Sequence, residues 1–275
     1  MDEKVARKIG KYEILAELRQ GGMAVVYKAR DPSIGCVVEL RTIDSRVVSD
    51  PEIFQRFQQE GQAAATLSHP NIQAICQIGE ADGRPYVILE HFEAETLQNI
   101  INRRTPLPLA AKLKVVEQFC EGLAHAHRHG VLHRAVKPAN ILVNKEGTAK
   151  LTHFLGTPAD APQIKAGTFR GTIPYAPPEQ TNEECVDCRS DIWSVACTIY
   201  EFIAYQKAFD GPDIPAIIAK ILGAEPEPLS RCCTGVPAEL ERVISKGLKK
   251  NIDERYQSMD EMLADLLAIS RGLQP

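Results

Sequence analysis

The sequence predicts an α+β fold in which a small β-rich part precedes a larger helical part. The first third of the chain consists mostly of short runs rich in β-branched and aromatic residues, which are typical of strands. After Glu93, apolar residues recur instead at steps of three and four, as a buried helix face requires. A chain of 275 residues is long for one domain but within range for a single two-lobed unit. We therefore expect one domain over residues 1–275, with a small lobe at about 10–91 and a larger lobe at about 92–270.

Strands around one helix are expected in the small lobe. Gly21-Gly22 and the segment 31–35 separate three β-type runs, and a turn at Asp82-Gly83 joins two more. The predicted strands cover residues 12–18, 25–29, 36–43, 72–78 and 85–90. Between the third and fourth strands, Pro51 opens a helical pattern that runs to about Leu67.

Helices dominate the expected larger lobe. The first has an apolar face formed by Leu113, Val116, Cys120 and Leu123, with His127 next along it. Further helical patterns cover residues 191–205, 213–222, 237–248 and 258–272. The segment 157–178 is rich in Pro, Gly and Thr and has no clear period, so we expect a long loop, which in a compact domain is usually functional.

Composition and charge narrow the classes of function. A formal net charge of −4 gives no reason to expect a nucleic-acid or anionic-membrane partner. The most apolar stretch, around 194–205, contains Glu201 and is too short to cross a bilayer. The N-terminus is charged and is followed by no signal-peptide core. We expect a cytoplasmic domain, attached to a membrane only if a segment beyond Pro275 supplies the anchor.

Eight cysteines raise the question of a metal site. Cys185 and Cys188 form a C-x-x-C pair, and Cys232 and Cys233 are adjacent. Four thiolates can hold zinc, but C-x-x-C alone is a weak signal, and adjacent cysteines lack the usual ligand spacing. Free thiols in a reducing compartment are therefore the favoured interpretation.

Several motifs in the larger part of the chain identify a family. Residues 133–140 read HRAVKPAN, 171–180 read GTIPYAPPEQ and 187–194 read DCRSDIWS. With the opening segments GKYEIL (10–15) and GGMAVVYKA (21–29), these motifs resemble the serine/threonine protein kinase family, and its bacterial branch in particular, in order and spacing. The resemblance implies the two-lobed protein kinase fold, with a small antiparallel β-sheet and one helix in the N-lobe and a larger helical C-lobe.

The resemblance also assigns the expected phosphate-binding positions, and several are altered. The family's phosphate-covering loop has three glycines, and the matching residues are Arg19, Gly21 and Ala24. Arg41 stands where the family has a lysine that contacts the phosphates and pairs with a helix glutamate, here Glu60. Arg41 and Glu60 could still pair bidentately, but a planar guanidinium does not replace a compact ammonium at the phosphates.

The expected adenine slot is altered as well. Glu39 replaces a small alanine that in the family lies against the adenine ring. An acidic side chain in an apolar slot is costly unless it turns away or finds a partner. Val26, Leu89 and Leu142 are the apolar residues expected at this slot, and core packing explains Val26 and Leu142 equally well.

The catalytic and metal-binding positions show the clearest losses. Ala135 replaces the family's aspartate that accepts or orients the substrate hydroxyl proton, which a methyl group cannot do. His153 replaces the aspartate that binds magnesium, an ion that prefers oxygen ligands, and a single histidine without arranged partners is more often structural. Lys137 and Asn140 are retained, the first expected at the γ-phosphate and the second as a metal ligand or a tie within the loop.

Residues that the family uses to hold its fold together are retained. The resemblance implies a hydrophobic column between the lobes, anchored from the central helix, and a buried ion pair that braces the large lobe. The column residues are Ala64, Ile75, His133 and Phe154, the anchor is Asp191, and the pair is Glu179 with Arg255. The scaffold is thus kept where the chemistry is lost.

Three histidines and two threonines also need an interpretation. His125, His127 and His129 are expected to pack and to lie at a helix end rather than to bind a metal, because positions i and i+2 do not share a helix face. Thr168 and Thr172 occupy the family's activation-loop positions. An unmodified loop is favoured over phosphorylation of Thr168, whose phosphate would be received by Arg134.

Two functions compete on this sequence. The joint loss at Arg41, Ala135 and His153 predicts a catalytically inactive pseudokinase that binds a protein partner, as a scaffold or as an allosteric regulator of an active bacterial kinase, with no cofactor expected. The alternative is a residual or atypical nucleotide-binding transferase, in which the retained lysine, asparagine and glutamate and the two arginines hold ATP without a metal.

Overall fold

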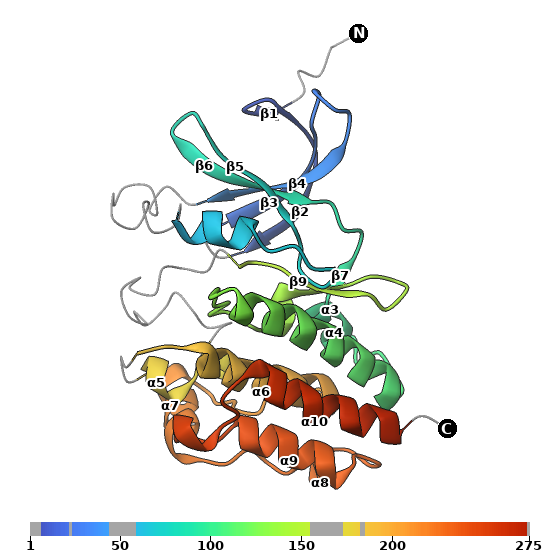
Figure 1. Cartoon of the computed structure of the whole chain (residues 1–275), viewed down its shortest axis with the longest axis vertical. Helices are drawn as coiled ribbons and strands as arrows, with labels where there is room; N and C mark the ends of the chain where they lie inside the picture. Colours follow the sequence, from blue (N-terminus) through green and yellow to red (C-terminus); the bar gives the residue numbers. More distant parts are fainter. Residues whose placement is uncertain (1–6, 22–23, 44–58, 155–172, 182–184, 274–275) are drawn as a thin grey trace. The chain divides into compact units, whose positions relative to one another are not determined.

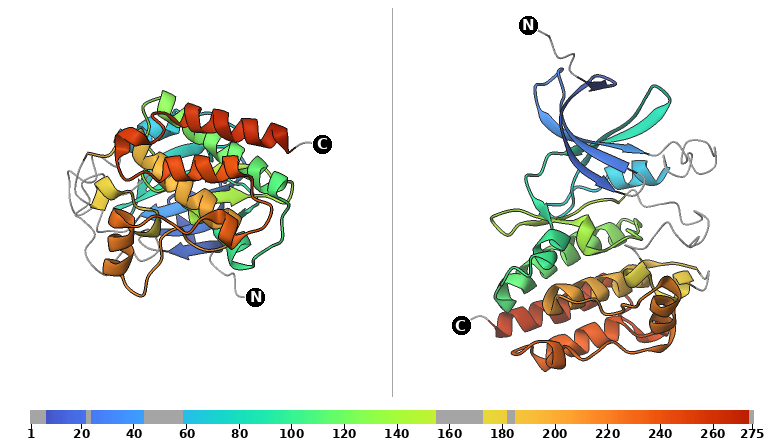
Figure 2. Two further views of the ribbon diagram at one scale, coloured as in Figure 1. Left: turned by 90° about the horizontal axis from the view of Figure 1, so that it is seen from below. Right: turned by 180° about the vertical axis from the view of Figure 1, so that it is seen from behind.

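The structure is a computed structural model of the chain that describes residues 7–21, 24–43, 59–154, 173–181 and 185–273 (Figures 1 and 2). The chain divides into two compact units. The first is formed by Met1–Ser68 and Gln73–Glu93, and the second by His69–Ile72 and Ala94–Pro275. No helix within the described ranges is long and apolar enough to span a bilayer.

The first unit is built on a curled antiparallel sheet with strand order β1-β2-β3-β4-β6-β5 (Figure 1). Its strands are β1 (Lys8–Ile9), β2 (Tyr12–Gly21), β3 (Ala24–Arg30), β4 (Val37–Ile43), β5 (Ile75–Ala81) and β6 (Arg84–Glu90), and residues 59–65 are helical. The period of two along each strand separates the sheet into two faces. One face is a buried apolar cluster that includes Tyr27, Ala29, Leu40 and Ile88.

The second unit is mainly helical. Its helices are α3 (Leu97–Asn102), α4 (Leu109–Arg128), α5 (Pro178–Thr181), α6 (Cys188–Ala204), α7 (Ile214–Gly223), α8 (Leu229–Cys232), α9 (Ala238–Gly247) and α10 (Met259–Gly272), with 3-10 turns at Pro138–Asn140, Ile173–Tyr175 and Ile252–Glu254. A small antiparallel sheet of β7 (Glu95–Thr96), β8 (Ile141–Val143) and β9 (Ala149–Leu151) lies in the same unit. Helices α4, α6, α9 and α10 pack together below it in Figure 1.

Helix α4 shows how the sequence pattern specifies the core. Leu113, Val116, Cys120 and Leu123 are all fully buried, as their spacing predicts. Gly122 lies on the same helix, and a Cβ atom there would sit 2.7 Å from the Asn71 carbonyl oxygen. Only glycine lets the segment at Asn71 approach α4 so closely.

The predicted elements are present with shifted ends. The fourth strand begins at Ile75 rather than Ile72, because Ile72 forms an isolated parallel bridge with Leu151. Helix α6 begins at Cys188 rather than Asp191, because Asp187 caps it by accepting a hydrogen bond from the Arg189 amide. The predicted helix over 51–67 is described only from residue 59. The short elements β1, β7 to β9, α3, α5 and α8 were not predicted.

Candidate functional site

The expected nucleotide-binding residues of the first unit share one face of its sheet. Arg19 on β2 lies opposite Val26 on β3, which in turn lies opposite Arg41 on β4. Opposed residues point to the same face, and so does Glu39, which precedes Arg41 by one full period of the strand. Leu89 on β6 lies opposite Glu39. The strand register therefore brings these five side chains together.

Glu39 is the buried acid of this face, with 2% of its surface exposed. Arg19 Nη2 donates a hydrogen bond to Glu39 Oε2 at 2.8 Å, and Gln73 Nε2 donates to the same oxygen at 3.2 Å. Gln73 Nε2 also donates to the Glu90 carbonyl oxygen at 3.0 Å. His91 Nδ1 lies 3.6 Å from Glu39 Oε1, too far for a hydrogen bond but within range of an ion pair when the ring is protonated. Glu39 thus has the partner that its burial requires.

The Arg19–Glu39 ion pair joins β2 to β4 across the strand between them, β3. Because β3 lies between β2 and β4, the pair passes over the face of β3 between Val26 and Lys28. Val26 is buried, as is Leu89. The charged pair thus lies on the sheet face that was expected to meet a purine ring. The sequence analysis did not predict a role for Gln73 and His91, because nothing in a sequence indicates which residue a polar side chain beside a strand will contact.

Arg41 lies on the same face of the sheet. It is half-buried, and its Nε is shielded from solvent without a hydrogen-bond partner among the described residues. Burial, and secondarily the charge of Arg19, lower the pKa of Arg41 to about 10, so the group is still charged at neutral pH. Glu60 is half-buried, and its pairing with Arg41 stays a prediction.

The hairpin expected to cover phosphates ends at Gly21 and Ala24, which pair with each other at the tips of β2 and β3. Their side-chain environments and residues 22–23 lie outside what the structure describes. The effect of the altered glycine positions on phosphate binding stays a prediction.

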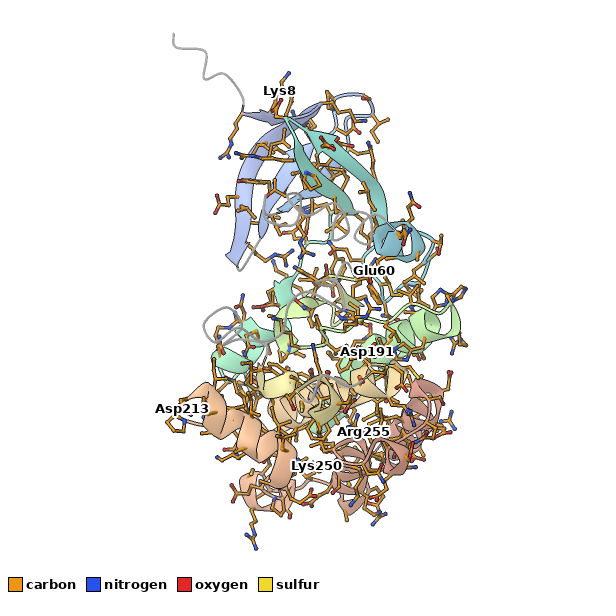
Figure 3. The ribbon with its side chains drawn as sticks, turned by 90° about the vertical axis from the view of Figure 1, so that its left-hand side faces the viewer. Lys8, Glu60, Asp191, Asp213, Lys250 and Arg255 are labelled. Atoms are coloured by element: carbon orange, nitrogen blue, oxygen red, sulfur yellow. The ribbon has the colours of Figure 1, made fainter. Side chains whose placement is uncertain are left out.

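The segment that matches the family's catalytic loop, residues 133–140, lies in the second unit and is held by Asp191 (labelled in Figure 3). The backbone N–H groups of His133 and Arg134 donate to its two carboxylate oxygens at 2.8 and 2.7 Å. His127 Nε2 lies 2.9 Å from the same carboxylate. Burial alone would raise the pKa of Asp191, but the contacts with His127 and His133 outweigh it and hold the pKa below its ordinary value. Asp191 is therefore ionised, and its carboxylate holds the backbone at the start of the loop.

Ala135 is positioned by its backbone. Its N–H donates to His133 Nδ1 at 3.2 Å, and its carbonyl oxygen accepts from Asn140 Nδ2 at 2.8 Å. Arg134, just before it, has a φ of 59°, a left-handed conformation that is uncommon outside glycine and clusters at functional sites. The loop thus keeps a defined geometry around a methyl group that has no proton to exchange.

His153 follows β9 in a left-handed conformation, with a φ of 71°. Next to it, the Phe154 ring packs edge-to-face against His133, with centroids 4.7 Å apart. Burial lowers the pKa of His133, so its ring is neutral, and since Nδ1 accepts from Ala135, Nε2 carries the proton and donates to the Thr152 carbonyl oxygen at 2.9 Å. In the described part of the chain, no three His, Cys, Asp or Glu side chains are grouped to hold a metal ion.

The retained residues Lys137, Asn140 and Leu142 follow Ala135 along the chain. Lys137 is half-buried and precedes the 3-10 turn. Asn140 is 7% exposed, and its own carbonyl oxygen accepts from the Thr152 amide at 3.0 Å, so this residue joins the loop to β9. Leu142 on β8 is fully buried.

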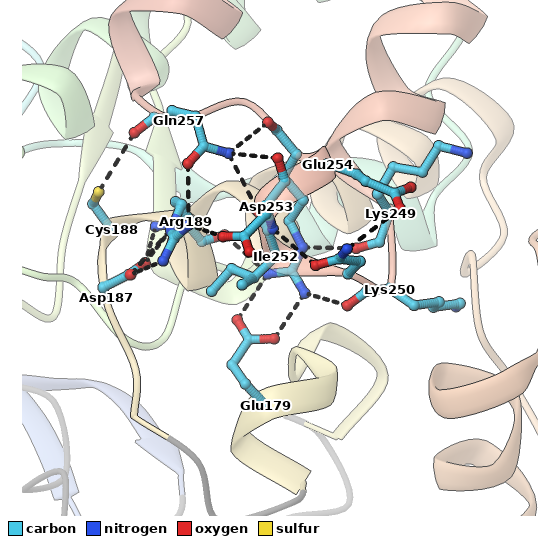
Figure 4. Close-up of polar contacts among 12 residues, drawn as sticks. Glu179, Asp187, Cys188, Arg189, Lys249, Lys250, Ile252, Asp253, Glu254 and Gln257 are labelled. Atoms are coloured by element: carbon cyan, nitrogen blue, oxygen red, sulfur yellow. Dashed lines mark hydrogen bonds and ion pairs between the residues drawn. The ribbon is translucent and has the colours of Figure 1, made fainter.

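Glu179, labelled in Figure 4, forms a buried bidentate ion pair with Arg255. Arg255 Nη1 and Nη2 each donate to one Glu179 carboxylate oxygen at 2.7 Å, and Ser190 Oγ donates to Oε1 at 2.6 Å. Arg255 Nε donates to the Lys249 carbonyl oxygen at 2.7 Å. Burial would raise the pKa of Glu179, but the hydrogen bonds from Arg255 and Ser190 lower it overall. Helix α5 is thereby fastened to α6 and to the segment before α10.

The remaining predicted residues fall in several places. Ala64 is buried and Ile75 half-buried in the first unit. The His125 ring packs between His69 and His129, with centroids 5.0 and 4.3 Å away, and His129 Nδ1 lies 2.8 Å from the His125 carbonyl oxygen. These are packing and helix-end contacts.

The thiols and the long loop complete the predicted residues. All eight cysteines are free. Cys188 Sγ faces the Gln257 carbonyl oxygen, and Cys232 Sγ accepts from Gln206 Nε2 at 2.7 Å. Thr168 and Thr172 lie outside the described residues.

The family is shown by the length and specificity of the match. A family model described as "Protein kinase domain" matches residues 12–266. The chain belongs to the protein kinase family, in its bacterial serine/threonine branch. It is 34% identical over 274 residues to serine/threonine-protein kinase PknB of Mycolicibacterium smegmatis, covering 96% of this chain and 44% of that protein. It is 32% identical over 279 residues to a probable serine/threonine-protein kinase, SCO3848, of Streptomyces coelicolor, covering 98% and 41%. The chain thus spans less than half the length of the curated relatives it matches.

Solved structures show the same fold. The kinase domain of PknI from Mycobacterium tuberculosis superposes with a TM-score of 0.77 over 96% of this chain and 98% of that one, at 24% identity. A further crystal structure of that kinase domain gives 0.77 over 98% of both chains at 25% identity. The first unit is therefore the N-lobe of a two-lobed protein kinase fold, and the second unit is its helical C-lobe.

Proposed function

We propose that this domain is a catalytically inactive pseudokinase that acts by binding a protein partner, as a scaffold or as an allosteric regulator in bacterial serine/threonine kinase signalling. The observation that carries the proposal is the buried network of Arg19, Glu39 and Gln73 on the N-lobe sheet face where adenine was expected.

Admitting a purine would mean breaking this network. Separating a buried ion pair typically costs about 3–5 kcal/mol, because the remaining charge loses its partner. The lower end applies here, since 30% of the Arg19 side chain is exposed and water can partly replace the carboxylate. A cost of about 3 kcal/mol weakens binding by roughly a hundredfold.

Phosphoryl transfer would also lack its positioned groups. The reaction relies on metal ions to neutralise charge and on a residue that orients the attacking hydroxyl. At the position that would orient the hydroxyl, Ala135 has only a methyl group. At the position that would bind the metal, His153 has an imidazole ring. Three independent steps (nucleotide binding, metal binding and base catalysis) are impaired together, which favours a role in binding.

The order of the catalytic loop supports one competing function. Asn140 and Ala135 remain joined, and Lys137 is retained beside them, so a metal-independent transferase has a formed loop to use. This alternative requires a phosphorylated product that disappears in Lys137→Ala.

A phosphoryl-transfer assay tests the proposal. Purified domain is incubated with labelled ATP, a general protein substrate and magnesium or manganese, with Lys137→Ala as the background. We expect wild type and Ala135→Asp to match that background, because restoring the base leaves the metal position unrepaired. Label on wild type that is lost in Lys137→Ala would contradict the proposal and favour the transferase.

A further inference from the structure

We propose that His125 and His129, at the C-terminal end of α4, form a two-histidine site for a divalent transition-metal ion such as Ni²⁺, Cu²⁺ or Zn²⁺. The proposed function requires no metal ion, so this site goes beyond it. The packing role expected from the sequence rested on positions i and i+2. His125 and His129 are four residues apart, a spacing that places both side chains on one helix face.

The two imidazole rings lie against each other at the end of the helix. Their centroids are 4.3 Å apart, with an angle of 36° between the ring planes. Two nitrogens that bind one ion at about 2 Å are themselves about 3 Å apart. The χ2 torsion of histidine is broad, so a small ring rotation brings one nitrogen of each ring to that separation. His129 is exposed, which gives an ion access from solvent, whereas His127 Nε2 is turned to Asp191.

His129 is already oriented as a ligand. Its Nδ1 lies 2.8 Å from the His125 carbonyl oxygen. A carbonyl oxygen only accepts hydrogen bonds, so Nδ1 carries the ring proton, and Nε2 of the neutral ring has a lone pair for an ion. Histidines that bind metals are commonly held in this way, by a hydrogen bond from the second ring nitrogen to a backbone carbonyl.

His125 supplies the second imidazole. Burial, and next the charges of His129 and Arg128, lower the pKa of His125, so its ring is neutral at neutral pH, as metal binding requires. On the other side of this ring, His69 packs with its centroid 5.0 Å away. His69 Nδ1 accepts a hydrogen bond from the Asn71 amide at 3.1 Å, so the proton of its neutral ring is on Nε2. His69 therefore supports the pair by packing and is not a ligand.

The surroundings suit an ion that prefers imidazole. The charge of Arg128 opposes a cation, but Arg128 is paired with Asp260 on α10, which offsets it. In the described part of the chain no cluster of three His, Cys, Asp or Glu side chains could hold a metal, so water would complete the coordination of this pair. Imidazole selects nickel, copper and zinc over magnesium. A bound ion would fasten the last turn of α4 just before residues 133–140.

Nickel binding tests the site. The domain without an affinity tag is titrated with nickel chloride by calorimetry, and its melting temperature is measured with and without the ion. Nickel is chosen because it binds imidazole and, unlike Cu²⁺, does not oxidise the free thiols. Cys185→Ser is the control for nickel held by the C-x-x-C pair, and Mg²⁺ is the control ion. Five proteins are compared: wild type, His125→Gln, His129→Gln, His69→Gln and Cys185→Ser.

We expect wild type, His69→Gln and Cys185→Ser to bind one Ni²⁺ ion with similar affinity. His125→Gln and His129→Gln should each lose at least about tenfold in affinity, because one of the two imidazoles is gone. Nickel should raise the melting temperature of the first three proteins and not of the other two, since only the folded helix brings both rings together. Magnesium, which prefers oxygen ligands, should not displace the nickel.

Four results would overturn the histidine site. The first two are no nickel binding by wild type up to millimolar concentration, and unchanged binding in His125→Gln and His129→Gln. The third is a loss in Cys185→Ser as large as that in His129→Gln, which would assign the ion to thiols. The fourth is an equal loss in His69→Gln, which would attribute the effect to ring packing rather than coordination. None of these results concerns phosphoryl transfer, so each leaves the pseudokinase proposal standing.

Discussion

At the scale of single residues, the central feature of this domain is the ion pair between Glu39 and Arg19. Glu39 alone would be harmful, since a buried carboxylate needs a partner, and Arg19 supplies that partner from β2. Their side chains meet at 2.8 Å across the strand between them, so each compensates for the other. The pair is therefore expected to behave as one unit in mutagenesis.

A double-mutant cycle tests that coupling. Arg19→Met should lower the free energy of unfolding by about 1–3 kcal/mol, because Glu39 loses its charged hydrogen-bond donor while staying buried. The double variant Arg19→Met/Glu39→Leu should recover most of this loss. Urea denaturation followed by circular dichroism measures both. A double variant as unstable as the sum of its two single variants would mean that the residues do not act together.

At the scale of elements, helix α6 organises the C-lobe from both ends. Near its start, Asp191 accepts hydrogen bonds from the amides of His133 and Arg134, and Ser190 donates to Glu179. At its end, Lys112 from α4 donates to the carbonyl oxygens of Phe202 and Ile203 at 2.9 and 3.1 Å. Burial lowers the pKa of Lys112 to about 8, which reflects how completely α6 and its neighbours enclose that ammonium.

Replacing the anchor on α6 should loosen the loop specifically. Asp191→Asn turns one acceptor into a donor that faces a backbone N–H, so we expect about 2–4 kcal/mol of destabilisation. The amides of His133 and Arg134 should exchange hydrogen faster than those of α9. Asp213→Asn is the control, because asparagine caps a helix about as well as aspartate and this cap, on α7, is remote from the loop. Unchanged exchange at His133 and Arg134 in Asp191→Asn would contradict the anchoring role.

At the scale of the whole molecule, two buried carboxylates should set the stability in acid. The pKa of Glu179 and the pKa of Asp191 are both lowered in the folded domain. The unfolded chain therefore takes up protons first as pH falls, so stability is fully present above about pH 5 and is lost as the pH falls through the ordinary carboxyl range toward the lowered folded values. Urea denaturation at several pH values between neutral and acid should show this decline, and Glu179→Met/Arg255→Met should decline less steeply. A parallel decline in both proteins would exclude the ion pair as its source.

Sequence patterns predicted the order of the elements but not all of their contacts. The strands and long helices follow from local periodicity and turn residues, and this is why they were predicted with only their ends displaced. The missed strands β7 to β9 are two or three residues long, too short to show a period. That Ala135 and His153 stand at altered catalytic positions is a prediction from the motifs alone.

The sequence could not predict which side chains pair on the sheet face where a nucleotide was expected. Arg19 and Glu39 are 20 residues apart, Gln73 is 34 residues from Glu39, and their meeting depends on strand register and side-chain reach. Whether Arg41 pairs with Glu60, as their charges allow, stays a prediction for a related reason. Complementary charge allows a pair, but competing contacts decide whether it forms.

Nucleotide binding tests the central claim most directly. The measurement is calorimetry of the wild-type domain with ATP and ADP in magnesium, in manganese and in EDTA, with Glu39→Ala/Arg19→Gly as the variant in which the adenine surface is uncovered. The account predicts that adenine adds nothing: ATP should bind wild type no more tightly than tripolyphosphate in any buffer, and more tightly than tripolyphosphate only in the variant. Micromolar binding of ATP to wild type, well above that of tripolyphosphate and dependent on magnesium, would contradict both the closed adenine slot and the loss of the metal site at His153.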